Sequence, residues 1–218
     1  NNGCIVASTC YTLSDPNDAD GEEAENGNIY GNLGALDLVF DGEANPWRGN
    51  QLVALRFGNV TVPQQSTIVN AYVQFTARGG NTNISPSSMN VALEAADNAA
   101  ALGWNTGNYS ARQRTQAIPW SPPVWSSPNA AGVDQRTPNL AGAVQEVVDR
   151  SGWAPGNALV VLIDGSGRRS AWSRNQSASR AARFCIAYGN PPIDCEGTTG
   201  GTALPGTACD DGNAGTGN

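Results

Sequence analysis

The stretch Thr67-Ile68-Val69-Asn70-Ala71-Tyr72-Val73-Gln74-Phe75 alternates between apolar and polar side chains from Val69 onward. This period of two is typical of a half-buried β-strand, in which successive side chains point to opposite faces of a sheet. We therefore expect one face of this strand to line a core and the other to face outward. The expected inward residues are Val69, Ala71, Val73 and Phe75, and the expected outward residues are Asn70, Tyr72, Gln74 and Thr76.

Similar strand signals recur along the chain, and 26 glycines and 13 prolines supply the turns that many short strands require. The same alternation occurs in three segments: Val53, Leu55 and Phe57; Met89, Val91, Leu93 and Ala95; and Phe184, Ile186 and Tyr188. Leu36–Phe40 is a further short strand-like segment. Ala158–Ile163 is a continuous apolar run that suits a central strand.

One segment has helical spacing instead. Leu140, Val144, Val147 and Val148 follow Pro138, and Gly152 comes shortly after, which predicts a helix over residues 138–150. Many strands with one short helix predict an all-β fold, a jelly-roll β-sandwich. We divide the chain into a cysteine-bearing lead (1–14), the sandwich (15–189) and an extended connector tail rich in Gly, Thr and Asp (190–218).

Composition excludes several kinds of chemistry. The chain has 12 basic residues, all Arg, with 19 acidic residues and no Lys or His, giving a net charge of −7. Serine or cysteine nucleophiles activated by His, Schiff-base lysines and His-containing zinc sites are therefore absent. The acidic balance argues against a nucleic-acid partner, and no apolar run approaches the roughly 18 residues of a membrane span. We expect a protein that is not an enzyme.

The five cysteines are confined to the two ends of the chain and form no C-x-x-C pair. This arrangement favours disulfides in an extracellular or cell-surface protein, and the alternative is a set of buried free thiols. Because the number is odd, at least one cysteine is unpaired or bonds to another chain. The residues are Cys4, Cys10, Cys185, Cys195 and Cys209.

The order of these pieces resembles that of the jelly-roll modules, including the DNRLRE type, of large secreted and surface proteins of bacteria. The resemblance covers roughly residues 15–189. It implies a relative of carbohydrate-binding modules that occurs in repeated or multidomain chains. The segments that carry it are Asp18–Glu23, Leu36-Asp37-Leu38, Leu52–Phe57, Thr67–Phe75, Val144–Val148 and Gly156–Leu159.

The tail, with Cys209-Asp210-Asp211-Gly212-Asn213, resembles a cysteine-rich connector that follows such modules and normally runs on into another cysteine-bearing strand. Asn1-Asn2-Gly3-Cys4-Ile5-Val6 looks like that continuation, placed at the opposite end of the chain. We therefore expect copies to join head to tail, with Cys209 facing Cys4 or Cys10 of a neighbour. The alternative is an internal loop closed by Cys195 and Cys209.

Two oxygen-rich segments are candidate calcium sites, because Ca²⁺ takes six to eight oxygen ligands. The resemblance also implies a structural calcium near the acidic first strand. The alternatives are a solvated acidic loop for the first segment and an Asx turn for the second. The candidate ligands are Asp18, Asp20, Glu22 and Glu23 in the first, and Asp210, Asp211 and Asn213 in the second.

Tryptophans in turn-like sequence suggest a polysaccharide-binding platform, since aromatic faces stack on sugar rings, although Trp also closes the ends of large sandwiches. The candidates are Trp104, Trp120, Trp125 and Trp153. Attached glycans are a second possibility. N-x-Ser/Thr sequons occur at Asn59, Asn83, Asn108 and Asn175, and the tail carries Thr198, Thr199, Thr202 and Thr207.

Glu94 and Asp97 are the acidic pair nearest to a glycosidase arrangement, but structural hydrogen bonding is the better interpretation of both. Five late arginines (Arg168, Arg169, Arg174, Arg180 and Arg183) are opposite in charge to the acidic start, and they either pair with it or are ordinary surface charge. The function that we expect is a non-catalytic structural subunit of a bacterial surface fibre or adhesive protein. The alternative is a carbohydrate-binding module of a secreted multidomain protein.

Overall fold

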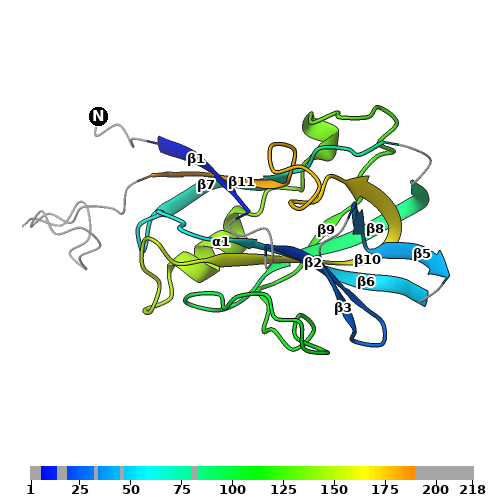
Figure 1. The fold of residues 1–218 in the computed structure, drawn as a ribbon. Helices are drawn as coiled ribbons and strands as arrows, with labels where there is room; N and C mark the ends of the chain where they lie inside the picture. Colours follow the sequence, from blue (N-terminus) through cyan, green and yellow to red (C-terminus); the bar gives the residue numbers. More distant parts are fainter. Residues whose placement is uncertain (1–5, 14–18, 32–33, 45–46, 80–82, 190–218) are drawn as a thin grey trace, which may run out of the picture.

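The computed structural model describes residues 6–13, 19–31, 34–44, 47–79 and 83–189. Two antiparallel β-sheets lie face to face, and a short helix lies beside one of them (Figure 1). The predicted all-β sandwich with one short helix is confirmed. The expected extended tail, residues 190–218, lies outside the described part.

The smaller sheet has three strands in the order β1-β11-β7. The larger sheet has the path β3-β2-β6-β10-β8-β9, with β4 paired to β10 and β5 paired to β6. The chain crosses between the sheets several times, as a jelly roll requires. The strands are β1 (Val6–Thr12), β2 (Asp20–Ala24), β3 (Ile29–Tyr30), β4 (Leu36–Leu38), β5 (Phe40–Ala44), β6 (Trp47–Phe57), β7 (Thr67–Gln74), β8 (Ile84–Leu93), β9 (Ile118–Trp120), β10 (Leu159–Ala171) and β11 (Arg183–Gly189).

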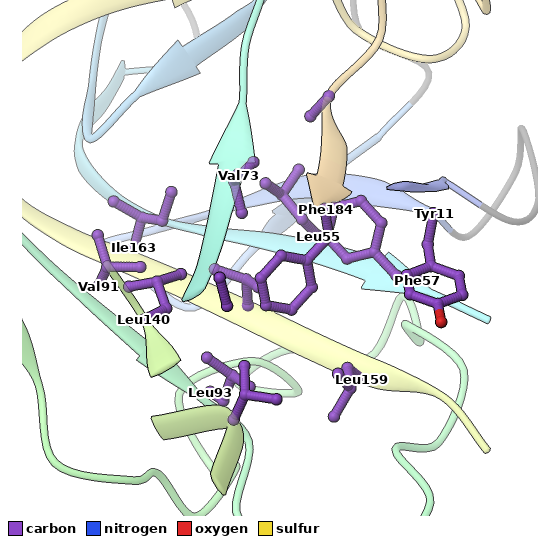
Figure 2. Close-up of a cluster of buried hydrophobic side chains, with 14 of the residues drawn as sticks. Tyr11, Leu55, Phe57, Val73, Val91, Leu93, Leu140, Leu159, Ile163 and Phe184 are labelled. Carbon is purple, nitrogen blue, oxygen red and sulfur yellow. The ribbon is translucent and has the colours of Figure 1, made fainter. Parts of the chain in front are cut away.

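The core fills the space between the two sheets (Figure 2). The alternating residues of β6 and β8 face it as the sequence predicts, and the rings of Phe57 and Phe184 meet across it with centroids 5.4 Å apart. A second apolar cluster covers the outer face of the large sheet, where Leu52 and Ala54 of β6 pack with Leu102 and Tyr109. The central strand β10 is therefore buried on both faces, which explains its continuous apolar run.

The helix α1 (Ala141–Val148) is shorter than the predicted span 138–150. Its buried residues Val144 and Val147 pack beside β7, and a 3-10 turn η1 (Val133–Gln135) precedes it. Residues 135–140 pair with the edge of β7: the Thr137 N–H donates to the Val73 carbonyl, and the Leu140 N–H donates to the Ala71 carbonyl. This segment closes the edge of the small sheet before the helix begins.

Three strand predictions need correction. Val69, expected inside, is 50% exposed, because a bulge shifts the pairing of β7 with β11 and turns Ile68 inward instead. The predicted strand Leu36–Phe40 is interrupted at Val39, whose φ of 65° breaks it into β4 and β5. Ala95 lies beyond the end of β8 and is half-buried.

The lead also differs from its expected role. β1 lies within residues 1–14 but forms a full strand of the small sheet, so the sandwich includes residues that the sequence assigned to the lead. Val6, at the start of β1, pairs with Gly189 at the end of β11. The two ends of the described sandwich therefore leave it from neighbouring positions at the same end (Figure 1).

Candidate functional site

The acidic strand β2 buries all three of its carboxylates. Asp20 and Glu22 pair with the inward residues Leu55 and Val53 and share their face, whereas Glu23 pairs with Leu52 and points to the outer face. Each carboxylate accepts a backbone hydrogen bond from a distant loop or strand. These bonds attach the start of the chain to segments more than 80 residues further on, or to β4.

Asp20 has a buried carboxylate oxygen that lacks a hydrogen-bond partner. Its Oδ2 accepts the Arg174 N–H at 2.7 Å, but its buried Oδ1 has no partner. Burial raises the pKa of Asp20, although the hydrogen bond and the charge of Arg174 oppose the shift. A buried carboxylate with one unused oxygen leaves an acceptor atom that a cation or a proton would satisfy.

Glu22 belongs to a buried polar cluster with Asp37 and Ser170. Its Oε1 accepts the Asp37 N–H at 2.7 Å, and the Ser170 hydroxyl donates to the Asp37 carboxylate. Burial raises the pKa of Asp37, against the hydrogen bond from Ser170 and the charge of Arg168, whose guanidinium lies 4.0 Å away. This cluster is not among the sites expected from the sequence, where its one signal is the polar centre of Leu36-Asp37-Leu38.

Glu23 fastens the loop that covers the outer face. Its Oε2 accepts the N–H groups of Tyr109 and Ser110 at 2.6 and 3.1 Å. The Tyr109 hydroxyl lies only 2.3 Å from where a Cβ on Gly21 would stand, so only glycine fits there. Burial raises the pKa of Tyr109, which keeps the ring neutral against β2.

The predicted calcium ligands do not all come together. Glu23 faces away from Asp20 and Glu22, and Glu22 already binds the Asp37 backbone. Within the described ranges, no group of three or more acidic, cysteine or histidine side chains is arranged to hold a metal ion. The other predicted ligands, Asp18, Asp210, Asp211 and Asn213, lie outside those ranges.

The four candidate sugar-binding tryptophans also do not share a surface. Trp120, Trp125 and Trp153 are at most 6% exposed, whereas Trp104 is 56% exposed. The rings of Trp120 and Trp125 pack with Phe75, and the indole N–H groups of Trp125 and Trp153 donate to backbone carbonyls at 2.9 Å. Three of these side chains therefore close the core, as the structural alternative expects, and Trp104 alone of the four presents its ring to solvent.

Two of the five cysteines form a disulfide. Cys10 of β1 and Cys185 of β11 lie directly opposite each other and are 175 residues apart in sequence. Their disulfide links the first strand of the sandwich covalently to the last. The spacing alone left this pairing open. Cys4, Cys195 and Cys209 lie outside the described part of the chain.

The acidic pair considered for glycoside hydrolysis is neutralised. Glu94 forms an ion pair with Arg112, and Asp97 forms one with Arg150, each at 2.5 Å. Glu94 and Asp97 thus make the structural hydrogen bonds that the sequence favoured over a glycosidase pair.

The late arginines have different roles. Arg174 lies beside Asp20, and Arg168 beside Asp37, so two of them meet acidic groups of the early strands within one chain. Arg169 is only 2% exposed and donates to the carbonyls of Pro122, Pro123 and Ile84. Arg180 stacks on the ring of Trp172. Arg183 is exposed at the start of β11.

Two of the open grooves on the described surface offer space for a binding partner. The first, of about 500 Å³, lies on the outer face of the large sheet and includes Glu25, Asn50, Arg114 and Asp164. Arg114 pairs with Asp164 at 2.7 Å, and Asn50 donates to Glu25 at 2.9 Å. The second, of about 410 Å³, runs beside β1 and is lined by Cys10–Thr12 with Gly58 and Asn59.

The four sequons differ in exposure. Asn59 is exposed at the β1 groove. Asn83 is partly buried and exchanges two hydrogen bonds with the Trp125 backbone, and the Asn108 amide oxygen accepts from Gly103 and Arg112. Asn175 is partly buried, with its amide oxygen enclosed. Asn59 is therefore the sequon whose side chain is most accessible for a glycan.

The chain matches no family model and no curated protein. In the part that the structure describes, no helix is long and apolar enough to cross a bilayer.

Proposed function

We propose that this chain is a non-catalytic, extracellular structural subunit of a bacterial surface fibre or adhesive protein, joined to its neighbours head to tail through its terminal segments. The sandwich provides a rigid body, and the segments on either side of it provide the joints. Both segments carry cysteines, which is the chemistry that a secreted covalent assembly needs.

The observation that carries this proposal is the closure of the sandwich by its own first and last strands. Because Cys10 bonds to Cys185, the body needs neither Cys4 nor the tail cysteines for its integrity. Because Val6 pairs with Gly189, the segments bearing Cys4 and Cys209 leave from the same end of the body. Of the two cysteines first considered for pairing with Cys209 of a neighbour, Cys4 is the one left.

Non-reducing electrophoresis of the native chain tests the covalent joint. We expect a ladder of multimers that collapses to one band on reduction, and loss of the ladder in Cys209→Ser. Cys10→Ser/Cys185→Ser is the control, because it removes the internal disulfide and leaves both joint cysteines. A single monomer band that reductant does not change would rule out the covalent joint.

Structural calcium belongs to the same proposal. The unpartnered Oδ1 of Asp20 is the one described oxygen that supports it, and the remaining ligands would come from Asp18 and its neighbours outside the described ranges. We expect the melting temperature to rise with added Ca²⁺ and to fall with a chelator, and Asp20→Asn to abolish the response. An unchanged melting temperature would argue against the site.

Polysaccharide binding is the second candidate function, and the outer groove supports it. Glu25, Asn50, Arg114 and Asp164 present carboxylate, amide and guanidinium groups, which are suitable hydrogen-bond partners for sugar hydroxyls. Retention on insoluble polysaccharide that is lost in Arg114→Ala but kept in Trp125→Phe would favour binding in this groove. The absence of retention would favour the fibre alone.

A further inference from the structure

β1 is the terminal strand of the small sheet, and no further described strand pairs with its outer side (Figure 1). The hydrogen bonds of β7 show which residues of β1 point to that side. On β7, the N–H of Val73 donates to Thr137 Oγ1, and the N–H of Ala71 donates to Asn139 Oδ1. The odd-numbered residues in this part of β7 therefore direct their main-chain groups away from β11, and the intervening Tyr72 faces β11.

This alternation carries across the sheet to β1. Tyr72 pairs with Cys185, so the neighbouring residues of β11, Phe184 and Ile186, direct their main-chain groups to β1. Their partners there are Tyr11 and Thr9. The opposed pair Cys10 and Cys185 is then a non-hydrogen-bonded pair, which agrees with their close Cα atoms, 3.9 Å apart.

Three residues of β1 consequently point their N–H and C=O groups to the outer edge. Ser8, Cys10 and Thr12 are also exposed through their side chains. An edge of this kind is a template for another strand, and natural proteins usually block it with a proline, a charge or a covering segment. None of the three is a proline or carries a charge.

The groove beside β1 lies at the Cys10–Thr12 end of this edge. Gly58 and Asn59, which follow β6, form its other wall. Tyr11 fixes the two walls together, because its hydroxyl accepts the Thr61 N–H at 3.2 Å and lies 3.1 Å from Thr61 Oγ1. The edge therefore opens into a preformed space rather than onto flat surface.

Charge marks the same end of the edge. Arg183 pairs with Thr12 and is exposed, and Arg174 donates to the Leu13 carbonyl. The tail, residues 190–218, contains four acidic residues and no basic one: Asp194, Glu196, Asp210 and Asp211. The groove lining itself is uncharged, but the tail is opposite in charge to Arg183, which is exposed at this end of the edge.

We propose that the outer edge of β1 receives part of residues 190–218 of a second copy as an added strand, with the tail lying in the groove beside Asn59. This β-augmentation supplies main-chain hydrogen bonds, and the exposed Arg183 supplies a charge opposite to that of the tail. The inference rests on the proposed head-to-tail function and names its docking site. A copy's own tail starts beside Val6, about 20 Å from the groove at a strand rise of about 3.4 Å per residue, and must double back to reach it.

Proline substitution at the edge tests this site in the full-length chain. Ser8→Pro/Thr12→Pro removes two outward N–H donors without touching the bonds to β11, and prolines are tolerated at such positions. The matched control, Ser8→Ala/Thr12→Ala, keeps both donors. In sedimentation velocity, we expect the wild type and the alanine control to associate alike, and the proline variant to associate at least about tenfold more weakly, because carbonyls of the incoming strand lose their donors.

The outcomes separate the two proposals. A proline variant that keeps its melting temperature and associates like the wild type would overturn the β1 site and leave head-to-tail assembly intact. A wild type that stays monomeric at every concentration would overturn both.

Hydrogen exchange provides a measurement that needs no variant. We expect the amides of Ser8, Cys10 and Thr12 to exchange fast in dilute protein and to become protected as the concentration rises. Protection that does not depend on concentration would show that the chain's own tail covers the edge, and it would overturn the second-copy assignment. Fast exchange within assembled material would overturn the edge as the docking site.

Discussion

Removing the Cys10–Cys185 disulfide should destabilise the sandwich strongly, because the bond closes nearly the whole described body into one loop. The two cysteines are 175 residues apart. In the chain-entropy model, closing a loop of that length lowers the conformational entropy of the unfolded chain and raises the free energy of unfolding by about 5 kcal/mol. For a domain of this size, the corresponding drop in melting temperature is about 10–20 °C.

The assay is urea unfolding of Cys10→Ser/Cys185→Ser beside the wild type, each with and without reductant. We expect the double variant to lose stability and to show a steeper denaturant dependence, because its unfolded chain is free to expand. Reductant should reproduce this change in the wild type, since Cys10 is exposed, and should add nothing in the double variant. A loss below about 1 kcal/mol would refute the reasoning, because the closed loop would then not limit the unfolded chain.

Three further predictions, which use four substitutions, concern the buried acids and the tryptophans. Because burial raises the pKa of Asp20 above its ordinary value of 3.8, its contribution to stability is greatest at low pH and is lost as pH rises through the raised pKa. Without calcium, Asp20→Asn should therefore melt at or above the wild type at pH 7, with the difference vanishing below about pH 4; a variant that melts lower at pH 7 contradicts this. Trp125→Ala should cost about 3–5 kcal/mol in urea unfolding, whereas Trp104→Ala should change stability by less than about 0.5 kcal/mol; equal effects would mean that the burial assignment is wrong. Glu23→Gln should weaken the bonds to the Tyr109 and Ser110 amides and speed their hydrogen exchange, and unchanged exchange would show that Glu23 does not hold the loop.

The strands that the sequence predicted best are those whose neighbours are regular. Val53, Leu55 and Phe57 alternate, and all three are fully buried, because β6 has partners on both sides in a fixed register. The burial of one face leaves a period of two in the sequence. The second apolar cluster is harder to predict from the sequence, because it includes Tyr109, which belongs to a loop far from β6 along the chain.

The failures occur where tertiary pairing overrides the local pattern. Nothing in the sequence around Val69 marks the bulge, which arises from the pairing of β7 with β11. Val39 lies in a continuous apolar stretch, yet it takes a left-handed conformation as the chain passes from a strand paired with β10 to one paired with β6. Both residues have strand-like side chains in positions set by partners far along the chain.

The candidate sites show the same division. The sequence identified an acidic segment, but the face on which each carboxylate lies depends on its partner strand, so Glu23 separates from Asp20 and Glu22. The sequence also places four tryptophans in turn-like segments, but it does not distinguish the three that close the core from the exposed Trp104. The pairing of Cys10 with Cys185 follows from a register between the first and last strands, which residue spacing does not encode.

Electron microscopy of the native, full-length protein in negative stain tests the central claim most directly. We expect long, uniform filaments whose repeat is one sandwich. Mixing in the Ser8→Pro/Thr12→Pro variant should shorten them, because its intact tail can bind a growing end while its blocked β1 edge cannot accept the next copy. Isolated globular particles at every protein concentration, with the Cys10–Cys185 bond intact, would contradict it.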